Sequence, residues 1–272
     1  MALKALLFDV DGTLADTESQ GHLPAYNAAF EEAGLEWRWS PELYRELLWQ
    51  PGGRERLRHY ILHHKPKLGV HRSKAREDTD NWVSEIHAIK SRHFKKRVSS
   101  GKVTLRPGVR RLMQEARAEG LQLAIVTNAS SRSLEPFLQH TLGEELLGGI
   151  TEVVSGEQVL RKKPAPDLYL EALKRLKLSA PECIAIEDSE MGLRAAHEAG
   201  IATLITINDD TREHDFSAAS MVVDQLGECD VPIHFLKGRS QDARCVTLPL
   251  LRNLVAGNHT KKTAKTRSKR SA

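Results

Sequence analysis

The chain has 272 residues, which is enough to bury a substantial core in one large domain or two unequal ones. No segment approaches the ~20 consecutive apolar residues of a membrane-spanning helix, so we expect a soluble, cytoplasmic protein with no membrane partner. The three cysteines, Cys183, Cys229 and Cys245, are odd in number and widely spaced, so we expect reduced thiols and not a disulfide framework.

The formal net charge of +4 comes from the C-terminus. Six basic residues occupy the last dozen positions: Lys261, Lys262, Lys265, Arg267, Lys269 and Arg270. The chain has 40 basic and 36 acidic residues, so without these six, 34 basic residues face 36 acidic ones. Residues 257–272 lack the apolar side chains needed to fold and are predicted to be a disordered basic tail. We expect a solvated terminus there and not a nucleic-acid partner.

Residues 5–8 form a continuous apolar run, which predicts a strand buried on both faces of a parallel sheet. Two aspartates, Asp9 and Asp11, follow this strand, and Gly12 comes next and allows a tight turn. Because such sheets bind ligands beyond the carboxyl ends of their strands, the pair is expected at the mouth of a site. We interpret Asp9 as a phosphorylatable nucleophile and Asp11 as an acid and base. A polar turn that merely closes the strand is the alternative.

Residues 18–100 show a helical pattern with many charges and no evident strand. Four tryptophans are expected to pack this segment: Trp37, Trp39, Trp49 and Trp82. Four of its cations could be exposed charges on helical faces: Arg54, Arg56, Arg58 and Lys90. A helical insert directly after the first strand is positioned to act as a lid that excludes water and recognises the far end of a substrate.

After residue 108, apolar runs and helical segments alternate. Strands are predicted at 121–126, 150–154, 183–186, 202–207 and 221–223, and helices at 109–119, 167–176 and 190–199. The pattern predicts an α/β fold, a Rossmann-like doubly wound parallel sheet with an inserted small α-helical cap domain. The expected domains are residues 1–17 and 101–256 for the core, 18–100 for the cap and 257–272 for the tail.

Polar residues follow three of the later strands. Thr127 and Asn128 end one, Lys163 precedes a helix, and Glu187 and Asp188 end another. Each could instead form a turn, a helix cap or a surface charge. Together they suit hydrolysis of a phosphate monoester, in which positioning and charge neutralisation supply most of the catalysis.

The chemistry assigns these groups complementary roles. Mg²⁺ held by Asp9, Glu187 and Asp188, with Asp11 also a candidate ligand, would reduce the repulsion between an aspartate and a phosphate dianion. Lys163 and the Thr127 hydroxyl would hold the phosphoryl oxygens. Asp11 would protonate the leaving alkoxide and then deprotonate the attacking water.

These segments, in this order, resemble the four motifs of the haloacid dehalogenase superfamily over residues 1 to about 225. The motifs are Asp9-Val-Asp11-Gly-Thr, Thr127-Asn128, Lys163-Pro-Ala-Pro-Asp and Glu187-Asp188-Ser189 with downstream Gly192. The helical insert resembles the small cap of β-phosphoglucomutase and related sugar phosphatases. The second aspartate favours phosphoryl transfer, because the dehalogenases of the superfamily lack it.

Further segments resemble the CbbY-like group, which hydrolyses xylulose-1,5-bisphosphate. They are residues 18–22, 52–57 and 87–91, with Arg106-Pro107-Gly108. This resemblance implies substrate contacts by Glu18, His22, Gly53, Arg54, Lys90 and Asn128, with Arg54 on the distal phosphate. CbbY-like chains often carry lysine at position 54, and most capped relatives carry the first-helix histidine one position earlier, where this chain has Gly21.

The resulting hypothesis is a Mg²⁺-dependent phosphatase that acts, as a monomer, on a small phosphorylated sugar through a phospho-aspartate at Asp9. A β-phosphoglucomutase-like mutase and a generic sugar-phosphate phosphatase are the enzymatic alternatives. A non-catalytic regulatory or nucleic-acid-binding protein that uses the basic tail is the alternative from a different class; the complete set of carboxylates argues against a non-catalytic regulator, and the lack of interleaved basic and aromatic residues against nucleic-acid binding.

Overall fold

The computed structural model describes residues 2–50, 52–228, 230–238 and 243–256. The predicted basic tail at 257–272 and Cys229 lie outside the described residues. Cys183 and Cys245 are free thiols, as expected. Across the part of the chain that is described, no helix is both long and apolar enough to cross a bilayer.

The chain divides into two compact units. An α/β unit takes in the described parts of 1–15, 105–131 and 142–272, and a helical unit takes in 16–104 with 132–141. The chain therefore leaves the α/β unit after Ala15 and returns to it at Leu105. The insertion after the first strand that the sequence predicts is present, and residues 132–141 join it from later in the chain.

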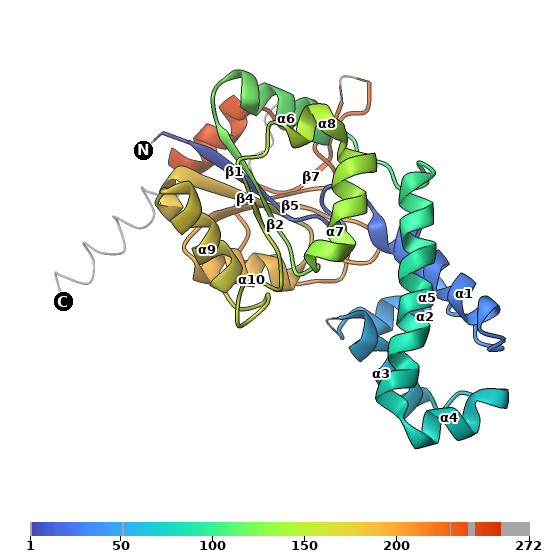
Figure 1. Cartoon of the computed structure of the whole chain (residues 1–272). Helices are drawn as coiled ribbons and strands as arrows, with labels where there is room; N and C mark the ends of the chain where they lie inside the picture. The colour runs from blue at the N-terminus through green and yellow to red at the C-terminus, as the bar shows by residue number, and fades with distance from the viewer. Residues whose placement is uncertain (1, 51, 229, 239–242, 257–272) are drawn as a thin grey trace. The chain divides into compact units, whose positions relative to one another are not determined.

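The α/β unit contains a seven-stranded sheet in the order β3-β2-β1-β4-β5-β6-β7 (Figure 1). Its strands are β1 (Ala5–Phe8), β2 (Gln122–Val126), β3 (Glu152–Val154), β4 (Cys183–Glu187), β5 (Ala202–Thr206), β6 (Met221–Val223) and β7 (Phe235–Lys237). The first six are parallel, and β7 pairs antiparallel with β6. The predicted Rossmann-like parallel sheet is confirmed. The edge strand β7 was not predicted, because only three residues form it and two of them are exposed.

Helices cover both faces of this sheet (Figure 1). They are α6 (Val109–Ala118), α8 (Gly143–Leu147), α9 (Asp167–Leu176) and α10 (Glu190–Glu198). Alternate residues of the central strands, among them Leu7, Ala124 and Ala185, pack with apolar side chains of α9 and α10 in one buried cluster. The strands are therefore apolar on both sides, as a sheet buried on both faces requires.

The helical unit contains α1 (Leu23–Glu32), α2 (Pro41–Leu47), α3 (Gly53–His64), α4 (Arg72–Glu77) and α5 (Thr79–Ser99), with shorter turns η1 (Glu18–His22) and η2 (Gly69–His71). Residues of α7 (Ser131–Phe137) and η3 (Leu138–Leu142) supply its second segment. An aromatic core that includes Trp37, Trp39 and Trp82 holds it together. Trp49 is 56% exposed, so the expectation that it packs the core is wrong.

Candidate active site

The register of the sheet places the polar motif residues at one edge. Phe8 of β1 pairs with Ile125 of β2 on one side and with Ile186 of β4 on the other. The residue that follows Phe8 is Asp9, whose backbone N–H donates to the Ile186 carbonyl at 3.0 Å. Asp9 thus lies at the carboxyl end of the sheet, beside Glu187, where parallel α/β folds bind ligands.

A buried lysine connects three parts of this edge. The Nζ of Lys163 donates to Oδ1 of Asp9 at 2.6 Å, to Oε1 of Glu187 at 2.6 Å and to the carbonyl oxygen of Val126 at 2.7 Å. These contacts use all three N–H donors of the ammonium group. The side chain of Lys163 is only 3% exposed, so its charge is neutralised within the protein and not by water.

Three buried carboxylates, of Asp9, Glu187 and Asp188, each place one oxygen within 4.8 Å of the others. The second oxygen of Glu187, Oε2, is buried with no hydrogen-bond partner among the described residues. A buried, unpartnered carboxylate oxygen in an acidic cluster fits a hard divalent cation, which binds through oxygen ligands. Of the four predicted metal ligands, Asp11 is not part of this group of carboxylates.

The electrostatics of the cluster support the same conclusion. Burial raises the pKa of Asp9 well above its ordinary value, Lys163 opposes this rise, and Glu187 and Asp188 add to it. Burial and the neighbouring Glu187 raise the pKa of Asp188 to about 8, against the hydrogen bond from Asn208. Burial by itself would lower the pKa of Lys163, but Asp9 and Glu187 raise it. A bound divalent cation would favour the ionised form of these acids and so lower their pKa values.

The loop after β1 bends sharply at Gly12, where φ is +86°. This left-handed conformation favours glycine, as the sequence predicts. A Cβ at Gly12 would also meet the Asp188 carboxylate and the Asn208 amide. Asn208 donates to Oδ2 of Asp188 at 2.7 Å and to the Gly12 carbonyl at 3.3 Å, so it links a candidate metal ligand to the loop that carries Asp11.

Thr127 and Asn128 follow β2, as predicted, but their side chains have different environments. Thr127 is buried, and its hydroxyl accepts a hydrogen bond from the Ala129 N–H at 3.0 Å. The Asn128 amide contacts the main chain of Lys163: Oδ1 accepts from the N–H at 2.9 Å and Nδ2 donates to the carbonyl at 3.3 Å. Asn128 therefore holds the lysine loop in place, and its predicted contact with substrate remains a prediction.

Two of the predicted binding residues meet inside the helical unit. The Nζ of Lys90 lies 2.7 Å from Nδ1 of His22, and it lies over the rings of Tyr26 and Phe94 at 4.9 and 5.2 Å from their centroids. Lys90 is only 6% exposed, and the His22 ring stacks on Phe94. A Cβ at Gly21 would lie 2.7 Å from the Phe94 ring.

Glu18 belongs to a second polar network in the helical unit. Tyr44 donates to Oε2 of Glu18, and Arg56 donates to the Tyr44 hydroxyl at 2.7 Å while lying 3.7 Å from Glu18. Arg56 is 8% exposed, so the alternative of an exposed charge does not apply to it. Its guanidinium also donates to the Leu47 carbonyl at 3.2 Å, and this backbone partner could not be inferred from the sequence.

Gly53 and Arg54 begin helix α3. The Gly53 carbonyl accepts a hydrogen bond from Tyr26 at 3.0 Å, and a Cβ at Gly53 would lie 2.8 Å from the Tyr26 hydroxyl and still closer to Nε2 of His87. Glycine is therefore required at this position by close packing. Arg54 is exposed, and its predicted contact with the distal phosphate remains a prediction.

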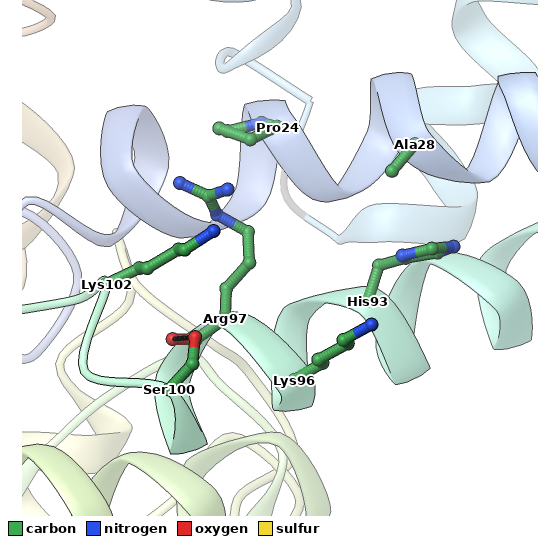
Figure 2. Close-up of a pocket in the computed structure, with 7 residues that line it drawn as sticks. All are labelled: Pro24, Ala28, His93, Lys96, Arg97, Ser100 and Lys102. Atoms are coloured by element: carbon green, nitrogen blue, oxygen red, sulfur yellow. Dashed lines mark hydrogen bonds between the residues drawn. The ribbon is translucent and has the colours of Figure 1, made fainter.

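A cavity of about 270 Å³ lies elsewhere in the helical unit, between α1 and α5 (Figure 2). None of the predicted binding residues lines it; its lining consists of Pro24, Ala28, His93, Lys96, Arg97, Ser100 and Lys102. Two of its basic side chains already have partners within the unit: Nε2 of His93 lies 2.7 Å from an oxygen of Glu32, and Arg97 donates to the Gln20 carbonyl at 2.7 Å.

Sequence reasoning missed two residues of the acidic site, Tyr169 and Asn208. The Tyr169 hydroxyl donates to Oε1 of Glu187 at 2.5 Å, and Tyr169 is fully buried in α9. Its position in an apolar helix face indicates only a core residue, although a buried tyrosine normally needs a partner for its hydroxyl. Asn208 follows β5, so the same signal that identified the other strand ends could have identified it.

Comparison with known proteins identifies relatives that cover most of the chain. A family model described as haloacid dehalogenase-like hydrolase matches residues 3–200. The plasmid-encoded protein CbbY of Cupriavidus necator is 45% identical over 231 residues, covering 85% of this chain and 89% of that protein. The CbbY protein of Rhodobacter capsulatus is 41% identical over 83% of this chain and 95% of that protein.

Solved structures agree with this match. A variant of CbbY from Rhodobacter sphaeroides in complex with xylulose-1,5-bisphosphate superposes with a TM-score of 0.72 at 34% identity, covering 84% of this chain and 98% of that one. A putative β-phosphoglucomutase from Thermotoga maritima superposes with a TM-score of 0.60 at 27% identity, covering 79% of this chain and 89% of that one.

Proposed function

The chain belongs to the haloacid dehalogenase-like hydrolase family, and we propose that it is a sugar-phosphate phosphatase whose substrate is xylulose-1,5-bisphosphate. The main observation in support of this reaction is that the buried Lys163 contacts both the proposed nucleophile Asp9 and Glu187. Both acids belong to the cluster of three carboxylates. This arrangement places a nucleophile, a cation and oxygen ligands for a metal at one point.

The first half-reaction transfers the phosphoryl group to Asp9. A carboxylate oxygen of Asp9 forms a bond to phosphorus as the ester P–O bond breaks, and Asp11 gives its proton to the departing alkoxide. Lys163, held 2.6 Å from Asp9, supplies positive charge beside the phosphoryl oxygens, with the Thr127 hydroxyl as a further donor. The products of this step are an aspartyl-phosphate and the sugar, which now carries a hydroxyl group in place of the transferred phosphate and keeps its second phosphate.

The second half-reaction restores the enzyme. Asp11, now ionised, removes a proton from a water molecule as the water oxygen bonds to phosphorus and the bond to Asp9 breaks. Inorganic phosphate leaves, Asp9 is again a carboxylate and Asp11 is again protonated. Asp11 is half-buried, and the turn at Gly12 that follows it is held by Asn208.

We assign the divalent cation of the site as Mg²⁺, held by Asp9, Glu187 and Asp188. Enzymes of this superfamily generally use a divalent metal, and hard oxygen ligands suit Mg²⁺. When bound, the ion would neutralise charge that develops on the phosphoryl oxygens. The unpartnered Oε2 of Glu187 and the acids of raised pKa in the cluster support this assignment.

The choice of substrate rests on the relatives, which include CbbY crystallised with xylulose-1,5-bisphosphate. Glu18, His22, Gly53, Arg54 and Lys90 are the proposed substrate-binding residues of the helical unit. The exposed guanidinium of Arg54, in the first turn of α3, has the charge and the geometry to bind a second phosphate.

The deciding experiment measures phosphate release with Mg²⁺ from xylulose-1,5-bisphosphate, ribulose-1,5-bisphosphate, glucose 6-phosphate and β-glucose 1-phosphate. We expect the highest kcat/KM for the first, and loss of activity in Asp9→Asn by at least about 10³-fold. Activity that depends on Asp9 without this preference would reject the named substrate. Conversion of β-glucose 1-phosphate to glucose 6-phosphate without phosphate release would identify a mutase instead.

A further inference from the structure

Arg106 is a buried arginine, 9% exposed, whose guanidinium contacts three separate segments of the α/β unit. One terminal nitrogen donates to the Gly12 carbonyl and, at 3.0 Å, to the Thr206 carbonyl. The other donates to the carbonyls of Ile207 at 2.5 Å and Asp224 at 2.8 Å. Four of its acceptors are therefore carbonyl oxygens, and the Thr206 hydroxyl accepts a further hydrogen bond at 3.3 Å.

These segments matter because one of them is the catalytic loop. Gly12 follows Asp11 directly. The other three carbonyls belong to the last residue of β5, the residue after it and the residue after β6. The backbone N–H of Arg106 also donates to the Leu14 carbonyl at 2.9 Å. Arg106 therefore connects the loop that carries Asp11 to the carboxyl edge of the sheet. Its backbone N–H and its guanidinium group both contact this loop.

The position of Arg106 in the chain adds a second constraint. The chain leaves the α/β unit after Ala15 and returns at Leu105, and these two residues form an isolated antiparallel bridge. Arg106 is the next residue, so it fixes the point where the chain returns to the unit. The flat, forked guanidinium can contact several carbonyls at once, which the single ammonium of lysine cannot do with the same geometry.

We propose that Arg106 is a positioning residue, which holds the Gly12 carbonyl and thereby the Asp11 carboxylate in the place required for proton transfer. The inference rests on the proposed function for its kinetic consequence only. Small displacements of a catalytic group cost up to about 10²-fold in rate, so the effect is expected in kcat.

The test compares Arg106→Lys and Arg106→Gln with the control Arg111→Lys. Arg111 also donates to backbone carbonyls, of Leu226, Gly227 and Val246 at 3.1, 3.0 and 2.9 Å, but not to the catalytic loop. Arg106→Gln introduces no buried unpaired charge, so it still provides the test if Arg106→Lys does not fold. Thermal unfolding identifies the variants that are folded at the assay temperature.

For a folded Arg106 variant we expect kcat to fall by about 10-fold to 100-fold with KM changed less than about 3-fold, and the control to keep the kcat of the wild type. Hydrogen exchange, followed by mass spectrometry of the peptide that contains residues 9–15, should be faster in the Arg106 variant only. The exchange measurement does not depend on activity, so it decides the positioning role even if the wild type hydrolyses no sugar phosphate.

Wild-type kcat in a folded Arg106 variant, or unchanged exchange in residues 9–15, would overturn the proposal. If both Arg106 variants are unfolded while the control is folded, Arg106 serves stability and the positioning role is rejected.

Discussion

The Nζ of Lys163 lies 2.6 Å from Oδ1 of Asp9, although 154 positions separate the two residues in the sequence. The same ammonium group lies 2.6 Å from Oε1 of Glu187, so one cation serves two buried acids. Removal of one partner from a buried ion pair is costly, because the remaining charge has neither water nor a counter-ion. The pair therefore links the stability of the α/β unit to its chemistry.

Lys163→Met should both inactivate and destabilise the protein. The variant leaves the Asp9 and Glu187 carboxylates without their shared cation, which should lower the free energy of unfolding by about 3–5 kcal/mol. Urea denaturation monitored by circular dichroism measures this change. Lys162→Met is the matched control, because Lys162 is exposed and its replacement should cost less than about 0.5 kcal/mol. Equal stability of the two variants would contradict the prediction.

Gly192→Ala should impair the acidic site. A Cβ at Gly192 would meet the carboxylate of Glu187, which Lys163 and Tyr169 hold in place. The methyl group should displace Glu187, lowering kcat/KM by about 10-fold to 100-fold and raising the Mg²⁺ concentration that gives half-maximal activity.

The control for this substitution is Gly148→Ala. The nearest atom to a Cβ at Gly148 is a carbonyl oxygen at 3.3 Å, and the residue lies at the end of α8, outside the acidic cluster. This variant should keep the kinetics of the wild type. If Gly192→Ala does the same, Glu187 is free to move without loss of function, and the prediction is wrong.

Arg54→Ala should weaken the binding of a bisphosphate substrate more than the binding of a monophosphate substrate. The guanidinium of Arg54 is the proposed partner of the second phosphate, so its removal should raise KM for xylulose-1,5-bisphosphate by at least about 10-fold. For a monophosphorylated sugar, KM should change by less than about 2-fold. Arg58→Ala, on the same helix, removes a charge that binds Asp80 at 2.7 Å and is the control. An equal rise in KM for both substrates would show that Arg54 does not bind the distal phosphate.

His87 should make the stability of the protein sensitive to mild acid. Burial, with the charges of Lys90 and Arg54, lowers the pKa of His87 to about 4 from its ordinary value of 6.5. Below pH 6.5 the unfolded chain binds a proton that the folded protein does not bind until about pH 4. The free energy of unfolding should therefore fall as the pH is lowered through this window.

The measurement compares urea midpoints at pH 7.5 and pH 5.0 for the wild type and for His87→Gln, which cannot titrate. Between pH 7.5 and pH 5.0, the urea midpoint of the wild type should fall further than that of His87→Gln. The titration of the carboxylates contributes to the change in both proteins, so the difference reports on His87. His63→Gln, which removes an exposed histidine of α3, should behave as the wild type. A loss of the same size in all three proteins would show that His87 does not contribute.

Local sequence patterns were sufficient for much of the fold. The apolar run at residues 5–8 and the later runs near 122, 183 and 202 lie in β1, β2, β4 and β5, because strands buried on both faces need apolar side chains at every position. The polar residues directly after them mark the carboxyl edge of the sheet. The short strand β7 has no such pattern, because its stability depends on pairing with β6 and not on burial.

The sequence by itself determined which residue types are gathered at the site: acids at 9, 187 and 188, a lysine at 163 and a glycine at the turn. Only the tertiary structure decided which of them make contact and which charges are buried. Arg56, Lys90 and Arg106 have the sequence character of surface cations, yet all three are buried. A long cationic side chain can be buried when carbonyls, aromatic rings and acids distant in sequence surround it, and no local pattern records those partners.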